Sequence, residues 1–308
     1  MVRIIEVGPR DGLQNEAVPI PTDAKLAFIH ALIAAGLKEI EVTSFVSPKW
    51  VPQLGDAAEL WEGISRGDAQ KAGVKFSALV PNAKGLERAI EVGVKRIALF
   101  TAASDAFTQK NINITVDQSL EVFGQVVEEF RAKVPGGWVR GYVSTAFECP
   151  YAGRISPPQV TRVARALMDM GVDELSIGDT IGVAAPKEVV VLTKALLDVA
   201  PKEKIAYHFH DTRGTAVANV ATALDLGIEA FDSSAGGLGG CPYAPGAGGN
   251  LATEDLIYFL ERSGMPTGVD PTRLAQASLP ILELLGRPPS AKAQLASLAR
   301  ASDATCST

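Results

Sequence analysis

The stretch EVGVKRIALF, residues 91–100, joins the end of a predicted helix to a short buried strand. Gly93 is a residue type that ends helices, and the apolar run RIALF that follows it is typical of a strand. A Gly-Val or Gly-Ile pair stands in the same place at Gly171 and at Gly227, between an amphipathic segment and another apolar run. This repeated unit predicts helices that alternate with parallel strands.

Eight apolar runs of strand length alternate with helical stretches along the chain. One such stretch is TDAKLAFIHALIAAG, in which we expect Thr22 to be the N-cap and Gly36 to end the helix. Eight units in 308 residues predict an α/β protein with a (β/α)8 TIM barrel. A doubly wound open sheet is the alternative, disfavoured because no G-x-G-x-x-G follows the first strand. The predicted strands are RIIEV (3–7), EIEVT (39–43), KFSALV (75–80), RIALF (96–100), VRGYVST (139–145), ELSIG (174–178), IAYHFH (205–210) and EAFDSSA (229–235).

We expect the barrel to carry a helical addition at its C-terminal end. After Met265 the segment DPTRLAQASLPILELLG predicts further helix, and the last residues of the chain are polar. Nothing before this segment resembles a linker. The predicted division is residues 1–265 for the catalytic barrel and residues 266–308 for a C-terminal helical extension and tail.

Composition and charge exclude several kinds of partner. The formal net charge is −6 and no cluster of Lys and Arg occurs, which argues against nucleic acid or an anionic membrane as a partner. Three cysteines without a CxxC pair fit a reduced, cytoplasmic setting. The N-terminal segment does not resemble a signal or transit peptide, and no apolar run reaches transmembrane length. A homo-oligomer is compatible with these features.

Two of the three histidines in the chain, His208 and His210, lie one residue apart at the end of a predicted strand. Strand side chains alternate between faces, so both imidazoles lie on the face opposite to Tyr207 and Phe209. Active sites of TIM barrels lie at the C-terminal ends of the strands. A histidine pair at this place favours metal binding over two hydrogen-bonded core histidines.

Further metal ligands are predicted on the neighbouring strands. Asp11 follows the first strand, which Gly8 and Pro9 end, and Asn250 ends the glycine-rich segment after the eighth strand. In a closed barrel the eighth strand lies between the seventh and the first, so Asp11 and Asn250 can converge on the histidine pair. These nitrogen and oxygen ligands suit Mg²⁺, Mn²⁺ or Co²⁺ better than a structural zinc ion.

Arg10 and Glu41 are predicted catalytic groups beside this metal site. The Arg10 guanidinium could form a surface ion pair, but next to a metal ligand it is suited to stabilising a developing oxyanion. Glu41 points into the barrel, where a buried carboxylate needs a partner such as Arg10. In LSIGDTIG the same alternation directs Ser176 inward and places Asp179 and Thr180 at the rim.

The glycine-rich segment 236–249 follows the eighth strand and is predicted to be a lid that closes on a substrate rather than a passive linker. Cys241 lies in its middle. Since a polar glycine loop offers this thiol little apolar surface, we interpret Cys241 as reactive rather than as an inert packing residue.

Six segments resemble the 3-hydroxy-3-methylglutaryl-CoA lyase family: VGPRDGLQNE, EVTSFVSPKWVPQ, AFECPY, GDTIG, HFHDTRG and GLGGCPYAPGAGGN. They extend from residue 7 to residue 250, nearly the whole predicted barrel. SFVSPKWVPQ and GLGGCPYAPGA are typical of these lyases. The RDG and HxHD elements are shared with metal-dependent synthases such as isopropylmalate and homocitrate synthase.

The resemblance implies retro-Claisen cleavage of an acyl-CoA thioester, 3-hydroxy-3-methylglutaryl-CoA, to acetyl-CoA and acetoacetate. It implies a divalent cation, Mg²⁺ or Mn²⁺ with Co²⁺ as a further candidate, held by Asp11, His208, His210 and Asn250. The implied catalytic residues are Arg10, Glu41, His208 and Cys241. The predicted substrate-binding residues are Arg10, Gln14, Ser44, Ser176 and Thr180.

Three other functions are alternatives. The same chemistry on citramalyl-CoA or a longer branched 3-hydroxyglutaryl-CoA fits the motifs, because Arg213 and Gly248 depart from the usual family residues near the mouth. A carbon–carbon bond-forming synthase is disfavoured because little chain remains for a further C-terminal domain. A passive metal scaffold would need neither Arg10 nor Glu41. Some family members carry a redox-active cysteine near the position of Cys306, to which we assign no role.

Overall fold

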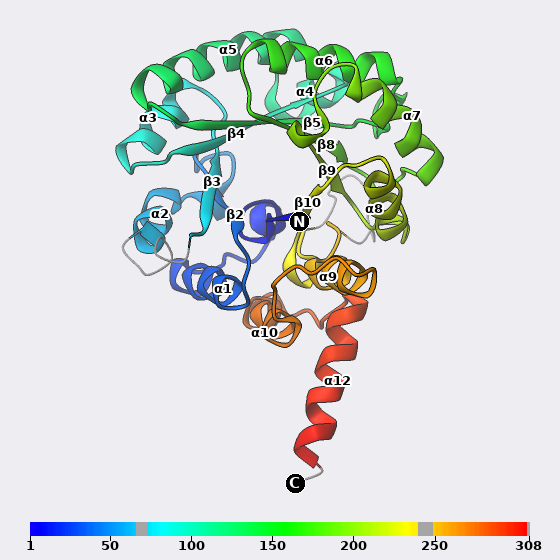
Figure 1. Ribbon diagram of the computed structural model, residues 1–308. Helices are drawn as coiled ribbons and strands as arrows, with labels where there is room; N and C mark the ends of the chain where they lie inside the picture. Colours follow the sequence, from blue (N-terminus) through cyan, green and yellow to red (C-terminus); the bar gives the residue numbers. More distant parts are fainter. Residues whose placement is uncertain (66–72, 240–248, 307–308) are drawn as a thin grey trace.

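The computed structural model describes residues 1–65, 73–239 and 249–306, with side chains described as far as residue 300. Within these ranges eight parallel strands close into a barrel in the order β1-β10-β9-β8-β5-β4-β3-β2. Helices surround the barrel (Figure 1). The predicted TIM barrel is therefore confirmed. The barrel strands are β1 (Arg3–Glu6), β2 (Glu39–Ser44), β3 (Lys75–Leu79), β4 (Arg96–Ala102), β5 (Trp138–Ser144), β8 (Glu174–Asp179), β9 (Ile205–Phe209) and β10 (Ala230–Ser233).

Each predicted strand overlaps one of these strands, and the ends differ by one or two residues. A short antiparallel hairpin of β6 (Glu148–Cys149) and β7 (Gly153–Arg154) follows β5 and was not predicted. Strands of two residues are too short to leave a periodic apolar pattern in the sequence.

The helix ends follow the predicted glycines, with one correction at the start of α1 (Thr22–Ala34). Gly36 comes after this helix with a φ of 108°, and the glycines of the three repeated pairs have φ values of 80°, 85° and 83°. Thr22 is not the N-cap. Pro21 occupies that position, and the Thr22 hydroxyl instead donates to Asp56 Oδ2 at 2.9 Å, which ties α1 to the segment before α2.

The other helices of the described residues alternate with the strands or follow them. They are α2 (Ala57–Ser65), α3 (Ala83–Glu91), α4 (Asp105–Ile112), α5 (Val116–Lys133), α6 (Pro157–Asp169), α7 (Pro186–Leu197), α8 (Ala216–Asp225), α9 (Thr253–Arg262), α10 (Pro271–Ala277), α11 (Leu279–Leu284) and α12 (Lys292–Cys306). None of them combines the length and the apolar character that a membrane span requires.

The barrel has an apolar outer face and a largely ionic interior. Tyr207 and Phe209 belong to the large core between strands and helices, whereas Ala206 belongs to a separate small cluster with residues of β1 and β10. The predicted alternation of β9 is thus confirmed. Inside the barrel, Arg140 and Asp232 form an ion pair of 2.6 Å, in a space that branched apolar side chains usually fill.

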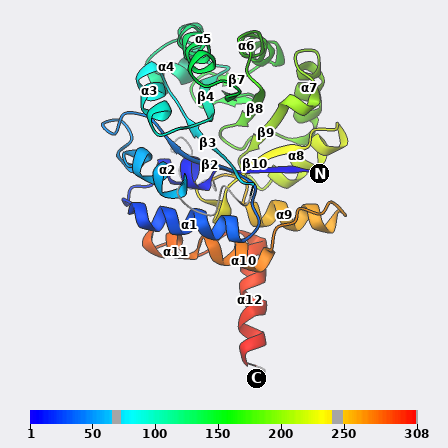
Figure 2. The same cartoon turned by 60° about the vertical axis from the view of Figure 1, so that its left-hand side comes forward.

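The segment after the barrel packs on α1 and α9. Figure 2 shows α10 and α11 against α1, and α12 extending away from the body of the molecule. Asp270 caps α10 by accepting from the backbone N–H groups of Thr272 and Arg273 at 2.9 and 3.1 Å. Arg287 pairs with Glu16 in the loop after β1. The division of the chain at residue 265 stays a prediction.

Candidate metal and active site

The turn after β1 positions two of the predicted site residues. Residues Gly8–Gly12 form one turn of π-helix, in which the N–H groups of Arg10, Asp11 and Gly12 all donate to the Val7 carbonyl oxygen at 2.8–3.1 Å. Such turns are rare and frequent at functional sites. Arg10 points inward with 4% of its side chain exposed, and the Asp11 side chain keeps 25% exposure at the mouth.

The structure brings the four predicted metal ligands together. Ligand atoms of Asp11, His208 and His210 lie within 4.8 Å of one another. The Nε2 atoms of the two histidines are 3.1 Å apart, and His208 Nε2 is 3.8 Å from Asp11 Oδ2. Asn250 joins this cluster because its Nδ2 donates to Asp11 Oδ2 at 2.9 Å, and an isolated bridge pairs Asn250 with His210.

The donor set fits a divalent cation. His208 Nδ1 donates to Asp232 Oδ2 at 3.1 Å, which fixes the ring and leaves the Nε2 lone pair directed at the cluster. His210 Nδ1 and Asn250 Oδ1 are buried atoms without a hydrogen-bond partner among the described residues. A buried acceptor without a partner costs free energy, so Asn250 Oδ1 favours a site that takes a ligand.

The protonation states of the cluster differ in a way that suits cation binding. Burial raises the pKa of Asp11, but the charges of Arg10 and both histidines outweigh it and hold this pKa well below its usual range. Burial and the neighbouring His208 lower the pKa of His210 to about 3, so its imidazole is neutral at physiological pH. Burial lowers the pKa of His208, but the hydrogen bond to Asp232 and the charge of Asp11 outweigh it, and the net shift is upward.

Arg10 lies between two carboxylates. Its Nε donates to Glu41 Oε1 and its Nη1 donates to Asp11 Oδ1 at 2.6 Å. The other oxygen of Glu41 accepts from the Tyr142 hydroxyl at 3.0 Å. Glu41 is fully buried, as predicted for a carboxylate that points into the barrel. Arg10 is therefore held in one orientation beside the candidate metal site.

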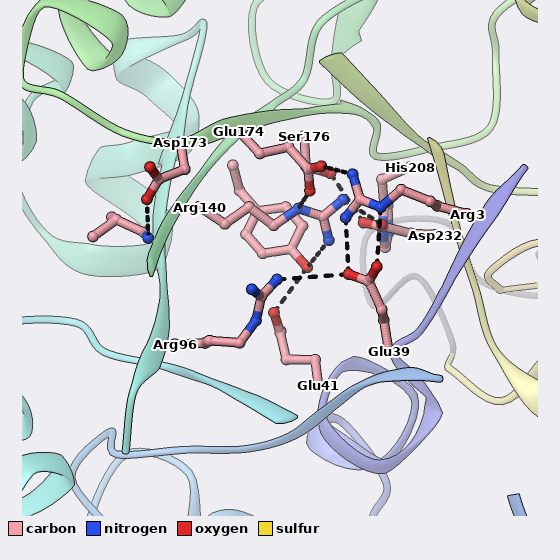
Figure 3. A network of polar contacts seen from close by, with 12 residues as sticks. Arg3, Glu39, Glu41, Arg96, Arg140, Asp173, Glu174, Ser176, His208 and Asp232 are labelled. Carbon is pink, nitrogen blue, oxygen red and sulfur yellow. Dashed lines mark hydrogen bonds and ion pairs between the residues drawn. The ribbon is translucent and has the colours of Figure 1, made fainter. Parts of the chain in front are cut away.

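Asp232 and Arg140 are buried partners of the site that the sequence analysis missed. Asp232 Oδ2 accepts from Ser176 Oγ at 2.9 Å as well as from His208, and Asp232 Oδ1 accepts from Arg140 Nη2 at 2.6 Å. The sequence does contain a signal for these residues. Asp232 in EAFDSSA and both Arg140 and Tyr142 in VRGYVST are polar residues within predicted strands, where a buried polar group needs a partner. Figure 3 shows these side chains converging inside the barrel.

The remaining predicted positions lie around the same rim. Ser44 is buried and its hydroxyl accepts from the Val46 N–H at 3.2 Å, and Thr180 Oγ1 accepts from the Thr145 N–H at 2.7 Å. Gln14 is half-buried just after the π-helical turn.

Several positions named in the sequence analysis lie outside the described residues. They are Cys241, Gly248, the central part of the predicted lid and the side chain of Cys306. The lid and the reactive Cys241 stay predictions.

Comparison with known proteins gives a consistent result. The HMGL-like family model matches residues 1–281. The chain is 50% identical over 300 residues to the 3-hydroxy-3-isohexenylglutaryl-CoA/hydroxymethylglutaryl-CoA lyase of Pseudomonas aeruginosa, covering 97% of this chain and 98% of that protein. It is 49% identical to the mitochondrial hydroxymethylglutaryl-CoA lyase of Bos taurus over 286 residues, covering 93% of this chain and 86% of that protein.

A solved structure of an HMG-CoA lyase from Acinetobacter baumannii in complex with coenzyme A and 3-methylmalate superposes with a TM-score of 0.88. Its sequence is 37% identical, and the match covers 95% of this chain and 93% of that one. The sequence motifs, the closed barrel and the full-length similarity agree, and the chain belongs to the HMGL-like family.

Proposed function

We propose that the chain is a metal-dependent lyase that cleaves 3-hydroxy-3-methylglutaryl-CoA to acetyl-CoA and acetoacetate. Relatives of this activity share about half of their residues with it over most of their length. The observation that carries the proposal is the Arg10–Asp11 pair, which places a fixed guanidinium next to a carboxylate of the candidate metal site. Retro-Claisen cleavage needs both groups, because a hydroxyl loses its proton while negative charge develops on a thioester.

Asp11, His208, His210 and Asn250 would hold the cation, for which Mg²⁺ or Mn²⁺ is the first choice and Co²⁺ the next, since the ligands are oxygen and imidazole nitrogen. A bound divalent cation lowers the pKa of a coordinated hydroxyl and orients the substrate. The supporting observation is Asn250 Oδ1, a buried atom without a hydrogen-bond partner among the described residues.

His208 is suited to accept the proton of the C3 hydroxyl. Its Nδ1 is bonded to Asp232, so Nε2 is the nitrogen that faces the mouth. Asp232 stabilises the imidazolium that results, as an orienting carboxylate does for a histidine base. Nε2 can ligate the cation or hold the proton, but it cannot do both at once. His208 would hold the cation through Nε2, and it would act as a base only where Nε2 is free of the cation.

Arg10 is suited to stabilise the enolate oxygen of the departing thioester. Its guanidinium is buried and already fixed by Glu41 and Asp11, so little reorganisation accompanies the development of charge. The enolate carbon must then receive a proton. Cys241 in the predicted lid is our candidate for this acid.

A second candidate substrate is a longer branched 3-hydroxyglutaryl-CoA. The Pseudomonas aeruginosa relative is named for an isohexenyl substrate as well as for the methyl one, and it matches this chain over nearly its whole length. Arg213 lies beside the mouth, where its Nη1 donates to the carbonyl oxygens of Ile181 and Gly182 at 2.7 and 3.1 Å. Citramalyl-CoA is a third substrate with the same chemistry.

A panel of these CoA thioesters tests the proposal through the release of acetyl-CoA. We expect the highest kcat/KM with 3-hydroxy-3-methylglutaryl-CoA, loss of activity after treatment with a chelator, and recovery with Mg²⁺ or Mn²⁺. A much larger kcat/KM for another thioester would move the assignment to that substrate. Full activity in metal-free protein would exclude the metal-dependent mechanism.

A further inference from the structure

We propose that Arg140 is a positioning residue that holds both halves of the site at once: the metal-binding half through Asp232, and the oxyanion-binding half through Tyr142 and Glu41. The inference rests on the proposed function. It assigns the orientation of the site residues in part to a side chain that lies below the mouth of the barrel. Figure 3 shows Arg140 beside Asp232 inside the barrel.

The strand order explains how one residue can reach both halves. In the closed ring β5 lies opposite β1, and β10 and β2 are the two neighbours of β1. Arg140 and Tyr142 are two residues apart on β5, so both side chains point into the barrel. Arg140 crosses to Asp232 on β10, while Tyr142 crosses to Glu41 on β2. The two contacts therefore end on either side of the strand that precedes Arg10 and Asp11.

The contact to Asp232 fixes the histidine side of the site. Asp232 Oδ1 accepts from Arg140 Nη2 at 2.6 Å, which leaves Oδ2 for His208 Nδ1. The Asp232 side chain is fully buried, so its charge depends on Arg140 for compensation. When Arg140 is replaced, the carboxylate loses its charged partner and keeps only the neutral Ser176 hydroxyl besides His208, so the direction of the His208 Nε2 lone pair is fixed less firmly.

The contact to Tyr142 fixes the arginine side. Arg140 Nη1 donates to the Tyr142 oxygen at 3.2 Å, so that oxygen acts as an acceptor there. Its single hydrogen is then directed to Glu41 Oε2 at 3.0 Å. Glu41 in turn presents its other oxygen to Arg10 Nε. The orientation of the catalytic guanidinium therefore depends on a chain of contacts that begins at Arg140.

Only an arginine has the geometry for this task. Its third nitrogen, Nε, forms an ion pair with Glu174 Oε1 at 3.0 Å, without the angles of a hydrogen bond, and Glu174 is also paired with Arg3 at the opposite end of the barrel. A planar guanidinium serves three directions at fixed angles, whereas a lysine ammonium on a flexible stem cannot. Both halves of the site are thereby anchored to the N-terminal end of the barrel.

The test uses full-length chains with Arg140→Lys, Asp232→Asn, Tyr142→Phe and the double change Arg140→Lys/Asp232→Asn. Mn²⁺ affinity is measured without substrate, kcat and KM are measured with 3-hydroxy-3-methylglutaryl-CoA, and thermal unfolding reports on the fold. Arg96→Lys is the matched control. Arg96 is another cation of the barrel, which stacks on Trp138 at 3.6 Å and contacts neither half of the site.

We expect Asp232→Asn to weaken Mn²⁺ binding by roughly 10–100-fold. We expect Tyr142→Phe to lower kcat while Mn²⁺ affinity stays unchanged. Arg140→Lys should show both losses, and the double variant should bind Mn²⁺ no more weakly than Asp232→Asn alone, because Arg140 acts on the metal site through Asp232. Arg96→Lys should show neither loss.

Additive losses of Mn²⁺ affinity in the double variant, or equal losses in Arg96→Lys, would overturn the proposal. If Arg140→Lys does not fold, Glu174→Gln takes its place, since Glu174 touches Arg140 and neither half of the site. We expect Glu174→Gln to lower both Mn²⁺ affinity and kcat, by less than Arg140→Lys would. Wild-type values of both quantities in Glu174→Gln would contradict the proposal. Because Mn²⁺ binding is measured without substrate, a wrong choice of CoA thioester leaves that half of the test valid.

Discussion

Arg10 is the residue whose removal should affect turnover most specifically. In Arg10→Gln the amide cannot supply the charged donors that the guanidinium directs into the site, so we expect kcat to fall by roughly 10²–10³ with a smaller change in KM. Arg162→Gln is the control, because Arg162 lies on the surface in an ion pair with Asp117. A rise in KM alone would show that Arg10 binds the substrate without stabilising the transition state.

His210 allows a separate test of metal binding, since its Nε2 faces His208 Nε2 at 3.1 Å. Replacing a residue that only supports a metal ligand typically weakens metal binding by roughly 10–100-fold. His210→Ala removes a predicted ligand itself, so it should weaken divalent metal binding by at least that much. Isothermal titration with Mn²⁺ measures the affinity, and circular dichroism checks the fold. His30→Ala is the matched control because His30 is exposed on α1. Equal affinities in the two variants would remove His210 from the ligand set.

At the scale of elements, the sequence predicted where strands lie, that Glu41 meets Arg10, and that the four metal ligands converge. It did not predict the contacts that Asp232, Arg140 and Tyr142 make behind them. The alternation in IAYHFH directs His208 and His210 inward because strand geometry is local. The partnership of His208 with Asp232, or of Tyr142 with Glu41, depends instead on barrel closure, which brings β10 beside β9 and sets β5 across from β2. Such contacts between distant strands leave no spacing that one sequence can reveal.

Glu6 of β1 connects the turn after β1, the turn after β10 and the start of α9 through hydrogen bonds. From its environment we predict a pH dependence of the free energy of unfolding. Its Oε1 accepts from the N–H groups of Gly8 and Ala235 at 2.7 and 3.0 Å, and its Oε2 accepts from Thr253 Oγ1 at 2.7 Å. Burial raises the pKa of Glu6 from 4.5 to about 7, although these hydrogen bonds lower it. The folded chain therefore binds this proton more tightly than the unfolded chain does. Glu6 should therefore lower the free energy of unfolding by about 3 kcal/mol as pH rises between these two values, and this is the contribution of Glu6 alone.

Glu6→Gln should remove that fall, because an amide can accept from Gly8 and Ala235 and donate to Thr253 without ionising. Urea unfolding from pH 4.5 to pH 8 measures the effect. Glu39→Gln is a control of opposite sign. Burial raises the pKa of Glu39, but hydrogen bonds from Arg3 outweigh it and lower this pKa to about 2, so the loss of that carboxylate should destabilise the chain above pH 4.5. Parallel pH profiles for Glu6→Gln and wild type would contradict the assignment.

At the scale of the whole molecule, α10, α11 and the start of α12 pack against the helices of the barrel, although the rest of α12 extends away from it. Ser278 and Leu282 lie against Gly236 at the start of the loop after β10, where a Cβ would come within 2.7 Å of the Ser278 hydroxyl. Gln294 of α12 is fully buried and donates to the Ala275 carbonyl oxygen at 2.9 Å. The extension therefore supports a segment that leads directly into the site.

A chain that ends at Met265 should consequently fail to keep a stable barrel. It loses the buried side chains of Leu274, Ile281 and Leu282 and exposes the faces of α1 and α9 that they cover. At about 1.5–3 kcal/mol for each buried aliphatic side chain, these three alone approach the roughly 5–15 kcal/mol that stabilises a typical domain. Near-ultraviolet circular dichroism and thermal unfolding should show lost tertiary packing, while a control chain that ends at Arg300 keeps the wild-type transition. A cooperative transition at the wild-type temperature in the chain ending at Met265 would mean instead that the barrel folds independently, and that residues 266–308 are the separate addition the sequence predicts.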